Sequence, residues 1–478
     1  MSRELSRRAF VGAAALGAAG CDRALSAVAG WLEGGLPDRF AVPTTTRVEP
    51  DLHLLRRATF GPRPGDIETL RNMGRQAWLD AQLGPSSIDD TACDLRVGAI
   101  DTLHLDAGLS FELPPEQIES ELRAGALVRA TCSKRQLLEV MTEVWTDHFH
   151  VAIGKGRCRH LRSPYDREAL RAHALGSFRD LLGAVTKSAA MLVYLDGAAN
   201  ERAARPNENH ARELLELHTL GVDGGYTQGD IQEVARCLTG FVVEEGGARP
   251  GTVTFVPARH DDGEKRVLGE TIPAGGGAGD VDSVLDIVAR HPKTAERVAR
   301  KLCGVFVADD PPEAAVARAA STFSRTGGRI DDVVRTILDE ERAEGALDAR
   351  IKRPFRLVVS ALRALGIEPR PEDLAPVLGR MGHAPFAWPT PDGYPTQGDA
   401  WLGTLIERFR FALGLGAAVD ADDAHLERLR DAAGGDDALA AHLLGRRPTD
   451  AERAAFALAP DSKARVTLVL ASPAFQRF

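Results

Sequence analysis

Apolar residues recur every three to four positions along most of the chain, which is the spacing of an amphipathic α-helix. This periodicity predicts helices over the ranges 64–83, 116–150, 165–190, 207–220, 229–241, 281–307, 311–340, 350–366, 371–381 and 400–416. Shorter Ala/Leu-rich helices are expected at about 423–433, 436–444 and 448–474, the last broken near Pro460. The pattern therefore predicts a mainly α protein that folds as a multi-helix single body.

The stretch from 242 to 272 departs from this helical spacing. Residues 252–256 alternate in polarity, the sequence HDDG at 260–263 is typical of a turn, and residues 266–268 again suit a strand. We therefore expect a small β-hairpin insertion near 252–270, in which 252–256 pairs with 266–268. The aspartate side chains of the turn should cap backbone amides.

Residues 206–241, PNENHARELLELHTLGVDGGYTQGDIQEVARCLTGF, crowd amides, acids and histidines onto a helix that also carries leucines. Pro206 suits the start of this helix and Gly221 its end, and Thr227 or Asp230 can cap the helix that follows. A polar atom that is buried without a partner costs roughly 1–3 kcal/mol. The segment therefore holds either a functional site or a buried structural network.

A second polar helix lies earlier in the chain. In EVMTEVWTDHFHV at 139–151, Trp145 belongs to the face that points into the core. Beside that face, Glu143, Asp147 and His150 are spaced i, i+4 and i+7. Acids and imidazoles at this spacing point to metal binding, to acid/base chemistry or to an interior network of hydrogen bonds.

These polar helices belong to a set of motifs that occur in order along the chain. The others are HLLRRATFGPRPGDIETL at 53–70, MLVYLDGAAN at 191–200, HDDGEKRVLGETI at 260–272, RIKRPFRLVVSALRALG at 350–366 and GHAPFAWPTPDGYP at 382–395. From about Asp51 to its end, the chain resembles the bacterial domain of unknown function 1800 family. The resemblance implies a mostly helical exported protein, often encoded beside a second twin-arginine protein family, and it implies no particular activity.

The polar helices supply the candidate site. We expect Asp147, His148, Glu213 and His218 to be the catalytic residues and to lie within one cluster of about 10 Å, because shared partners avoid the cost of burying polar groups. The residues expected to bind substrate are Trp145, Asn207, Asn209, Arg212 and Trp388. The carboxylates and imidazoles could exchange protons with a ligand, and Arg212 could hold an anionic group.

Two other interpretations of the same helices remain open. The pairs Asp147–His150 and His210–Glu213 could face each other and hold a metal ion. Against this, the family pattern has an aromatic residue at the position of His210 and a residue other than histidine at His150. Alternatively, the polar groups satisfy one another in the interior and the centre is purely structural. The sequence identifies neither a metal nor a cofactor.

The segment GHAPFAWPTPDGYP at 382–395 is too rich in proline to form a helix or a central strand. Its rings, Phe386, Trp388 and Tyr394, either line a groove for a sugar or peptide or close the helical body as plugs. Upstream, Lys352, Arg353 and Pro354 should open a helix, and we expect the two cations to pair with acids rather than with a ligand phosphate.

The N-terminus carries export features. Arg7 and Arg8 resemble a twin-arginine motif, a short apolar run from 11 to 20 follows, and Ala27 to Ala29 suits a cleavage site. We therefore expect a signal region at 1–29, a helical family domain at 48–478, and a place in the periplasm or cell envelope. Cys21 offers an alternative lipid anchor, and no later run is long enough to span a membrane.

Charge and cysteines narrow the expectations further. A net charge of −9 argues against nucleic acid as a partner. The six cysteines show no metal-binding spacing, so we expect most of them to be small buried apolar residues. We hypothesise an exported hydrolase acting on a glycan or other envelope polymer. The alternative is a non-enzymatic binding or assembly protein that works with a co-exported partner, and whether the protein is an enzyme stays open at this stage.

Export can be tested directly. Replacing both Arg7 and Arg8 by Lys should trap the full-length precursor in the cytoplasm, because the arginine pair is the element that the folded-protein export route recognises. Fractionation followed by immunoblotting measures the distribution. Normal export of the double variant would show that the N-terminal assignment is wrong.

Overall fold

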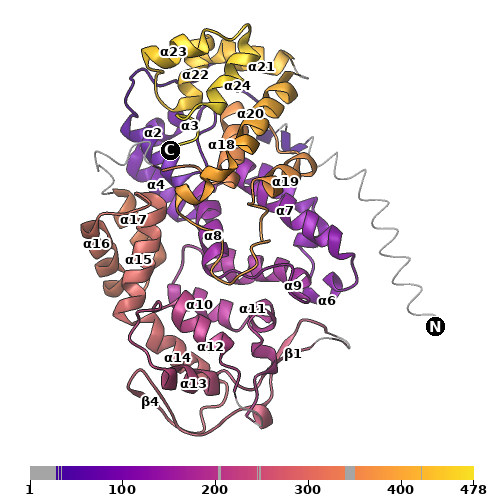
Figure 1. The fold of residues 1–478 in the computed structure, drawn as a ribbon, viewed down its shortest axis with the longest axis vertical. Coiled ribbons are helices and arrows are strands. Elements are labelled where there is room, and N and C mark those ends of the chain that lie inside the picture. The colour runs from indigo at the N-terminus through magenta and orange to yellow at the C-terminus, as the bar shows by residue number, and fades with distance from the viewer. Residues whose placement is uncertain are drawn as a thin grey trace, which may run out of the picture.

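The computed structural model describes residues 28–30, 32–33, 35–202, 206–244, 246, 249–339, 350–420 and 423–478. Arg7, Arg8 and Cys21, on which the export and lipid-anchor predictions rest, lie outside these residues. Helices form most of the described chain and α8 lies near the middle of the molecule (Figure 1). The prediction of a mainly α protein is therefore confirmed.

Most helices of the first half lie within the predicted ranges, with additional breaks. They are α2 (Pro50–Ala58), α3 (Asp66–Met73), α4 (Arg75–Leu83), α5 (Thr91–Gly98), α6 (Ala107–Ser110), α7 (Pro115–Cys132), α8 (Gln136–His148), α9 (Cys158–Pro164), the π-helix η3 (Tyr165–Arg171), α10 (Phe178–Thr186), α11 (Ala189–Tyr194), α12 (Asn209–Glu213), the π-helical turn η5 (Leu214–His218) and α13 (Gln228–Cys237). Of these, α2, α5, α6 and α9 were not predicted. The break between α3 and α4 falls at Gly74, whose φ of 83° ends the first helix. Thr227 and Asp230 form a reciprocal capping box at the start of α13, as predicted.

The second half is also helical. It contains α14 (Gly279–Ala289), α15 (Pro292–Phe306), α16 (Glu313–Arg325), α17 (Ile330–Asp339), α18 (Pro354–Leu365), α19 (Pro371–Arg380), the 3₁₀ segment η7 (Gly398–Thr404), α20 (Leu405–Asp420), α21 (Asp423–Ala433), α22 (Asp436–Leu444), α23 (Asp450–Phe456) and α24 (Ser462–Ala471). The break predicted near Pro460 separates α23 from α24. Among the described residues, no helix is both long and apolar enough to cross a bilayer.

The β-structure occurs where it was expected, but its predicted pairing is wrong. Strand β2 (Val253–Phe255) pairs with β1 (Phe241–Val243), and β3 (Lys265–Val267) pairs with β4 (Glu270–Ile272), both antiparallel. The reason is local: Leu268 and Gly269 both have positive φ, which makes a tight two-residue turn between β3 and β4. At HDDG, Asp261 accepts a hydrogen bond from the Gly263 amide, so the predicted capping is confirmed.

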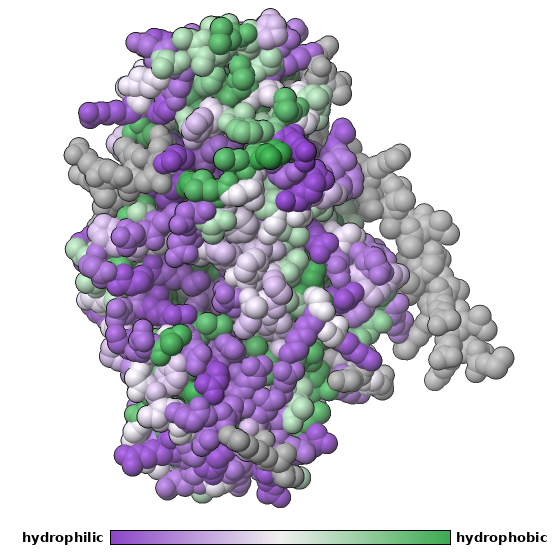
Figure 2. Space-filling view, viewed as in Figure 1, coloured by the Kyte–Doolittle hydropathy of each residue, from purple (hydrophilic) through white to green (hydrophobic). Residues whose placement is uncertain are grey.

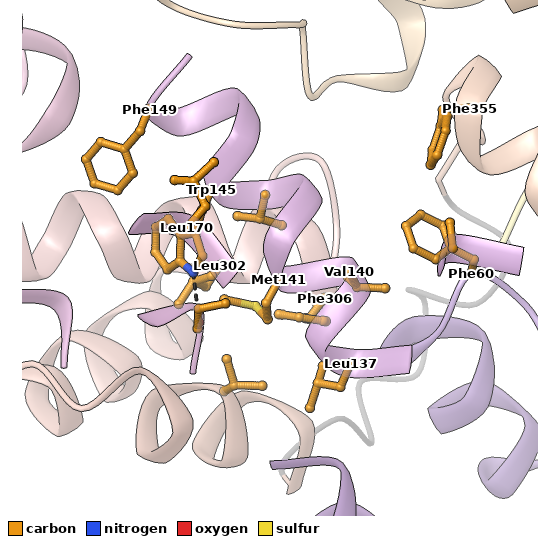
Figure 3. Close-up of a cluster of buried hydrophobic side chains, with 14 of the residues drawn as sticks. Phe60, Leu137, Val140, Met141, Trp145, Phe149, Leu170, Leu302, Phe306 and Phe355 are labelled. Carbon is orange, nitrogen blue, oxygen red and sulfur yellow. Dashed lines mark hydrogen bonds between the residues drawn. The ribbon is translucent and has the colours of Figure 1, made fainter. Parts of the chain in front are cut away.

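The larger of two apolar cores among the described residues runs through the molecule and includes side chains from Phe40 to Phe475, and a smaller one includes Leu103 and Ile118. Helix α8 is central to the larger core: Met141 and Trp145 lie beside Leu302 and Phe306 of α15 (Figure 3). The five cysteines that the structure describes are all buried, which confirms their expected role as small apolar residues. The core thus fixes one face of α8 and leaves its other face for polar contacts.

The proline-rich loop at 382–395 packs against the C-terminal end of α8. At Gly393, φ is 72°, and an added Cβ would lie 2.1 Å from the carbonyl oxygen of Asp147. Gly382 has nearly the same φ, 73°, but a Cβ there would meet nothing within 4 Å. Only glycine therefore allows the loop to approach Asp147 this closely.

The two glycines form a matched pair for a stability test. Gly382→Ala should lower the free energy of unfolding by about 1–2 kcal/mol, the cost of a left-handed conformation for alanine. Gly393→Ala should cost several kcal/mol, because it adds a clash with backbone to the same conformational cost. Urea denaturation of both variants measures the difference. Equal losses would mean that the loop does not depend on close approach to α8.

Candidate functional site

Helix α8 carries acids along the face that the core leaves free. Glu139, Glu143 and Asp147 follow one another at four-residue intervals, so they lie one helical turn apart on the same side. The first of them pairs with Arg171 of η3 through both oxygens, one contact measuring 2.9 Å. Nη2 of Arg353 contacts both of the others, at 3.2 Å from Glu143 Oε1 and 2.6 Å from Asp147 Oδ2. The expected pairing of this arginine with acids is confirmed.

A pocket of about 660 Å³ opens on this acidic face. Its charged and polar lining comes from Arg129, Glu139, Thr142, Glu143, Thr146, Asp147, Asp166, Arg171, Arg353, His383 and Tyr394, and its apolar lining includes Phe60, Leu103, Leu122, Phe355 and Phe386. Burial raises the pKa of Glu143; Arg353 acts in the opposite direction, and Asp147 adds to the rise. The pocket thus holds one acid that takes up a proton more readily than an ordinary glutamate beside a second acid that contacts the same arginine.

His148 lies on the core side of α8 instead. Its ring is 5.6 Å from that of Trp145 and 4.5 Å from that of Phe149, measured between centroids, and its Nε2 donates to the carbonyl oxygen of His218 at 3.1 Å. Burial lowers the pKa of His148 well below its ordinary value, with Lys301 adding to the effect. Residues adjacent on a helix point about 100° apart, which explains why this imidazole does not share the pocket with Asp147.

His218 and His210 are deeper still. Neither ring nitrogen of either residue has a hydrogen-bond partner, and burial lowers the pKa of His218 to about 3 and that of His210 to about 4. Both imidazoles are therefore neutral in the folded protein. His148 and His218 do lie together, with ring centroids 6.3 Å apart, but they form part of the interior and do not line the pocket at Asp147.

Glu213 lines neither of the pockets that Asp147 lines. It is half-buried at the end of α12; burial raises its pKa, nearby Glu216 raises it further, and Arg212 opposes the rise. Asp147 instead pairs with Arg353. Of the four predicted catalytic residues, only Asp147 lines the pocket on the acidic face of α8. Among the described residues, no three His, Cys, Asp or Glu side chains are arranged to hold a metal ion.

The amides of the 206–221 segment hold backbone in place. Asn207 Oδ1 accepts from the amide of Asn209, whose own side chain donates to the carbonyl of Leu195 at 3.2 Å. The Asn207 amide in turn donates to Asn200 Oδ1 at 2.9 Å. These contacts tie the start of α12 to the chain that follows α11, so the structure gives both asparagines structural partners.

The other predicted binding residues also have protein partners. Arg212 contacts Glu208, Glu216 and Gln228, all at 3.0–3.4 Å. The indole of Trp145 is fully buried and donates to the carbonyl of Ala174 at 2.8 Å, which leaves it no surface for a substrate.

The aromatic residues of the 382–395 loop do not all have the same role: some line the pocket and one does not. Phe386 and Tyr394 line the pocket, whereas Trp388 lies half-buried with its indole donating to Asp392 at 3.1 Å. Tyr394 stacks near His383, with ring centroids 4.4 Å apart, and His383 Nε2 accepts from Arg353 at 3.0 Å. The loop therefore supplies part of the pocket wall and supports the central arginine.

Lys301 of α15 is a site residue that the sequence reasoning missed. Its position three residues after Val298 and four before Val305, at the edge of an apolar face, was the available signal. It lines a second pocket, of about 510 Å³, together with Glu143, Asp147 and Arg353. Its pKa is lowered from 10.5 to about 8, chiefly by burial; Asp147 opposes this shift, and Arg297 and Arg353 add to it.

This buried amine predicts a pH-dependent stability. With a pKa of about 8 in the folded protein against 10.5 ordinarily, the unfolded chain binds more protons between these values, so stability rises with pH through that window. Lys301→Met should therefore raise the free energy of unfolding at pH 7, by up to about 3 kcal/mol, and the gain should shrink towards pH 10.5. Urea denaturation at the two pH values measures this. A less stable variant at pH 7 would mean that the amine has a stabilising counter-ion.

The comparisons with known proteins agree with the motifs. No curated protein and no solved structure matches the chain. One family profile, described as "Protein of unknown function (DUF1800)", matches residues 53–477, which is nearly the whole chain and includes every pocket residue described above. On this match, the chain belongs to the DUF1800 family.

Proposed function

We propose that this protein is an exported hydrolase that cleaves a glycan or similar envelope polymer in the pocket on the acidic face of α8. One observation carries the proposal: Glu143 and Asp147 lie one helical turn apart inside a pocket and contact the same nitrogen of Arg353. Two carboxyl groups whose surroundings differ are the usual apparatus of glycoside hydrolysis.

The two carboxyl groups suit different roles. Glu143, whose pKa burial raises, is the proton donor to the oxygen of the bond that breaks. Asp147, held at 2.6 Å from Arg353, is the carboxylate that accepts a proton from the attacking water. The attacking water supplies the hydroxyl group of one product, and Glu143 supplies the hydrogen of the other. The proton that Asp147 took from the water then returns to Glu143. Arg353 orients both acids and does not itself react.

The pocket walls favour a ring-shaped substrate. Phe355, Phe386 and Tyr394 present flat aromatic surface beside the acids, and such rings pack against the apolar faces of sugars. The pocket is open to solvent, so a polymer could lie across its mouth with one bond at the acids. In this proposal the histidines predicted to be catalytic serve packing instead, because burial keeps them neutral and away from the pocket.

The cellular place in this proposal rests on the N-terminal sequence. The arginine pair and the apolar run of the first 20 residues support export in the folded state. An enzyme exported to the periplasm would meet envelope polymers as its substrates. Lipid attachment at Cys21 would keep it at the membrane surface and would leave the pocket chemistry unchanged.

A second candidate function is partner binding, and one surface feature favours it. Leu405, Ile406, Phe409 and Leu413 of α20 are between 45% and 66% exposed and share one face of that helix. Apolar residues also gather on the visible surface in the upper part of the molecule, where the C-terminal helices lie (Figure 2). Such a face suits the apolar surface of a co-exported protein, and the polar centre would then be purely structural.

The variant Glu143→Gln separates the two candidates. It keeps the size of the side chain and removes the transferable proton, so release of reducing ends from purified envelope polysaccharide should fall at least 100-fold. The thermal melt should stay close to that of the parent, because Arg353 retains Asp147. Glu116→Gln, on an exposed residue of α7, is the matched control and should leave turnover unchanged.

Two results would contradict the hydrolase proposal. Turnover that survives in Glu143→Gln would remove this residue from the chemistry. A parent protein that releases no reducing ends, together with a large loss of stability in the variant, would favour the structural role and partner binding.

A further inference from the structure

The second pocket, at Lys301, has an unusual charge balance. Four cations line it, Lys301, Arg350, Arg353 and Arg356, against the two acids Glu143 and Asp147. Arg350 is neutralised by Asp309, which lies 2.8 Å from its Nε. Arg353 contacts both lining acids. Three acids therefore face four cations, which leaves one net positive charge, and the remaining cations are Lys301 and Arg356.

Neither of the two remaining cations has a carboxylate partner in the part of the chain that the structure describes. Arg356 donates to the backbone carbonyls of Arg56, Arg57 and Thr59, and none of its contacts is an acid. The amine of Lys301 makes no hydrogen bond or ion pair with a described residue. A third donor, Nε of Arg353, is buried without a hydrogen-bond partner. Buried charge without compensation is costly, and such a pocket is completed by an anion.

The two pockets meet at the proposed reaction centre. Glu143, Asp147 and Arg353 line both of them, so a ligand held in the second pocket lies next to the acids of the first. The second pocket, about 510 Å³ when the open solvent at its mouth is included, admits the carboxylate group of a larger ligand. Arginine and lysine together suit a carboxylate, since arginine binds it in a forked geometry and lysine adds a point charge.

We infer that the substrate of this protein is an acidic polymer, whose carboxylate-bearing sugar unit binds between Lys301 and Arg356 while the neighbouring bond lies at Glu143 and Asp147. The inference rests on the proposed hydrolase function and specifies its substrate class. It also gives Lys301 a purpose: the amine destabilises the empty protein and is compensated when the anionic unit binds.

Isothermal titration calorimetry tests the inference on full-length mature protein that carries Glu143→Gln, so that turnover does not interfere. The probes are an oligogalacturonate, a neutral cello-oligosaccharide of the same length, and inorganic phosphate. Each is titrated into this background, into the background with Lys301→Met, and into the background with Lys293→Met. Lys293 is the matched control because it lies on α15 as well but is exposed, 3.2 Å from Glu296.

We expect the acidic oligomer to bind at least tenfold more tightly than the neutral oligomer or phosphate. Lys301→Met should weaken its binding at least tenfold, Lys293→Met should not, and added salt should weaken it further. Equal affinity for acidic and neutral oligomers, no binding of the acidic oligomer, or no effect of Lys301→Met would overturn the inference. Binding of phosphate as tight as that of the oligomer would also overturn it, because the pocket would then recognise a free anion.

The failure of the proposed function has a different signature. If the acidic oligomer binds through Lys301 but the parent protein never cleaves an acidic polymer, the anion site is supported and the hydrolase proposal is contradicted. If the parent protein cleaves neutral polymers and shows no preference for acidic ones, the hydrolase proposal is supported and the anion site is contradicted.

Discussion

Arg353 lies in the interior between α8 and α18, where a guanidinium group is stable only beside compensating negative charge. Glu143 and Asp147 supply that charge, and His383 accepts a further hydrogen bond from the same nitrogen. Leaving Arg353 without either carboxylate would cost about 3–5 kcal/mol, whereas loss of one acid leaves it paired with the other. The contact therefore joins α8, α18 and the 382–395 loop, and it separates the two pockets whose walls these elements build.

Burial shifts the pKa values of the acids and of the bases around this contact in opposite directions. It raises the pKa of Glu143 and lowers those of Lys301 and the interior histidines, because the uncharged form of each group is favoured away from water. For His148 and His218 the result is a neutral ring that packs like an aromatic residue. For Glu143 and Lys301, which line pockets, the same effect leaves a proton available to a ligand and a charge in need of an anion. Shifts of this kind are typical of functional sites, although structural networks produce them too.

The many polar residues of the 206–221 segment are explained by their hydrogen bonds within the protein. Its asparagines satisfy backbone groups that would otherwise be unpaired where the chain enters α12, and Arg212 joins acids on the surface of its own helix. A conspicuous motif therefore does not mark the pocket by itself. The pocket instead depends on the acids Glu139, Glu143 and Asp147 of α8, whose spacing is common in surface helices. It also depends on cations that other helices, distant in sequence, contribute.

The sequence by itself determined the helices, the capping of α13, the burial of the cysteines and the pairing of Arg353 with acids. These features follow from periodicity, from capping chemistry and from the cost of unpaired charge, all of which act locally or on any buried group. Only the tertiary structure decided which acid Arg353 meets, since 206 positions separate it from Asp147, and which strands pair. It also decided that Asp147 and His148 face different surroundings and that Lys301 points into a pocket. Residues distant in sequence are brought together by the packing of whole helices, and a pattern read along one helix does not contain the orientation of the next.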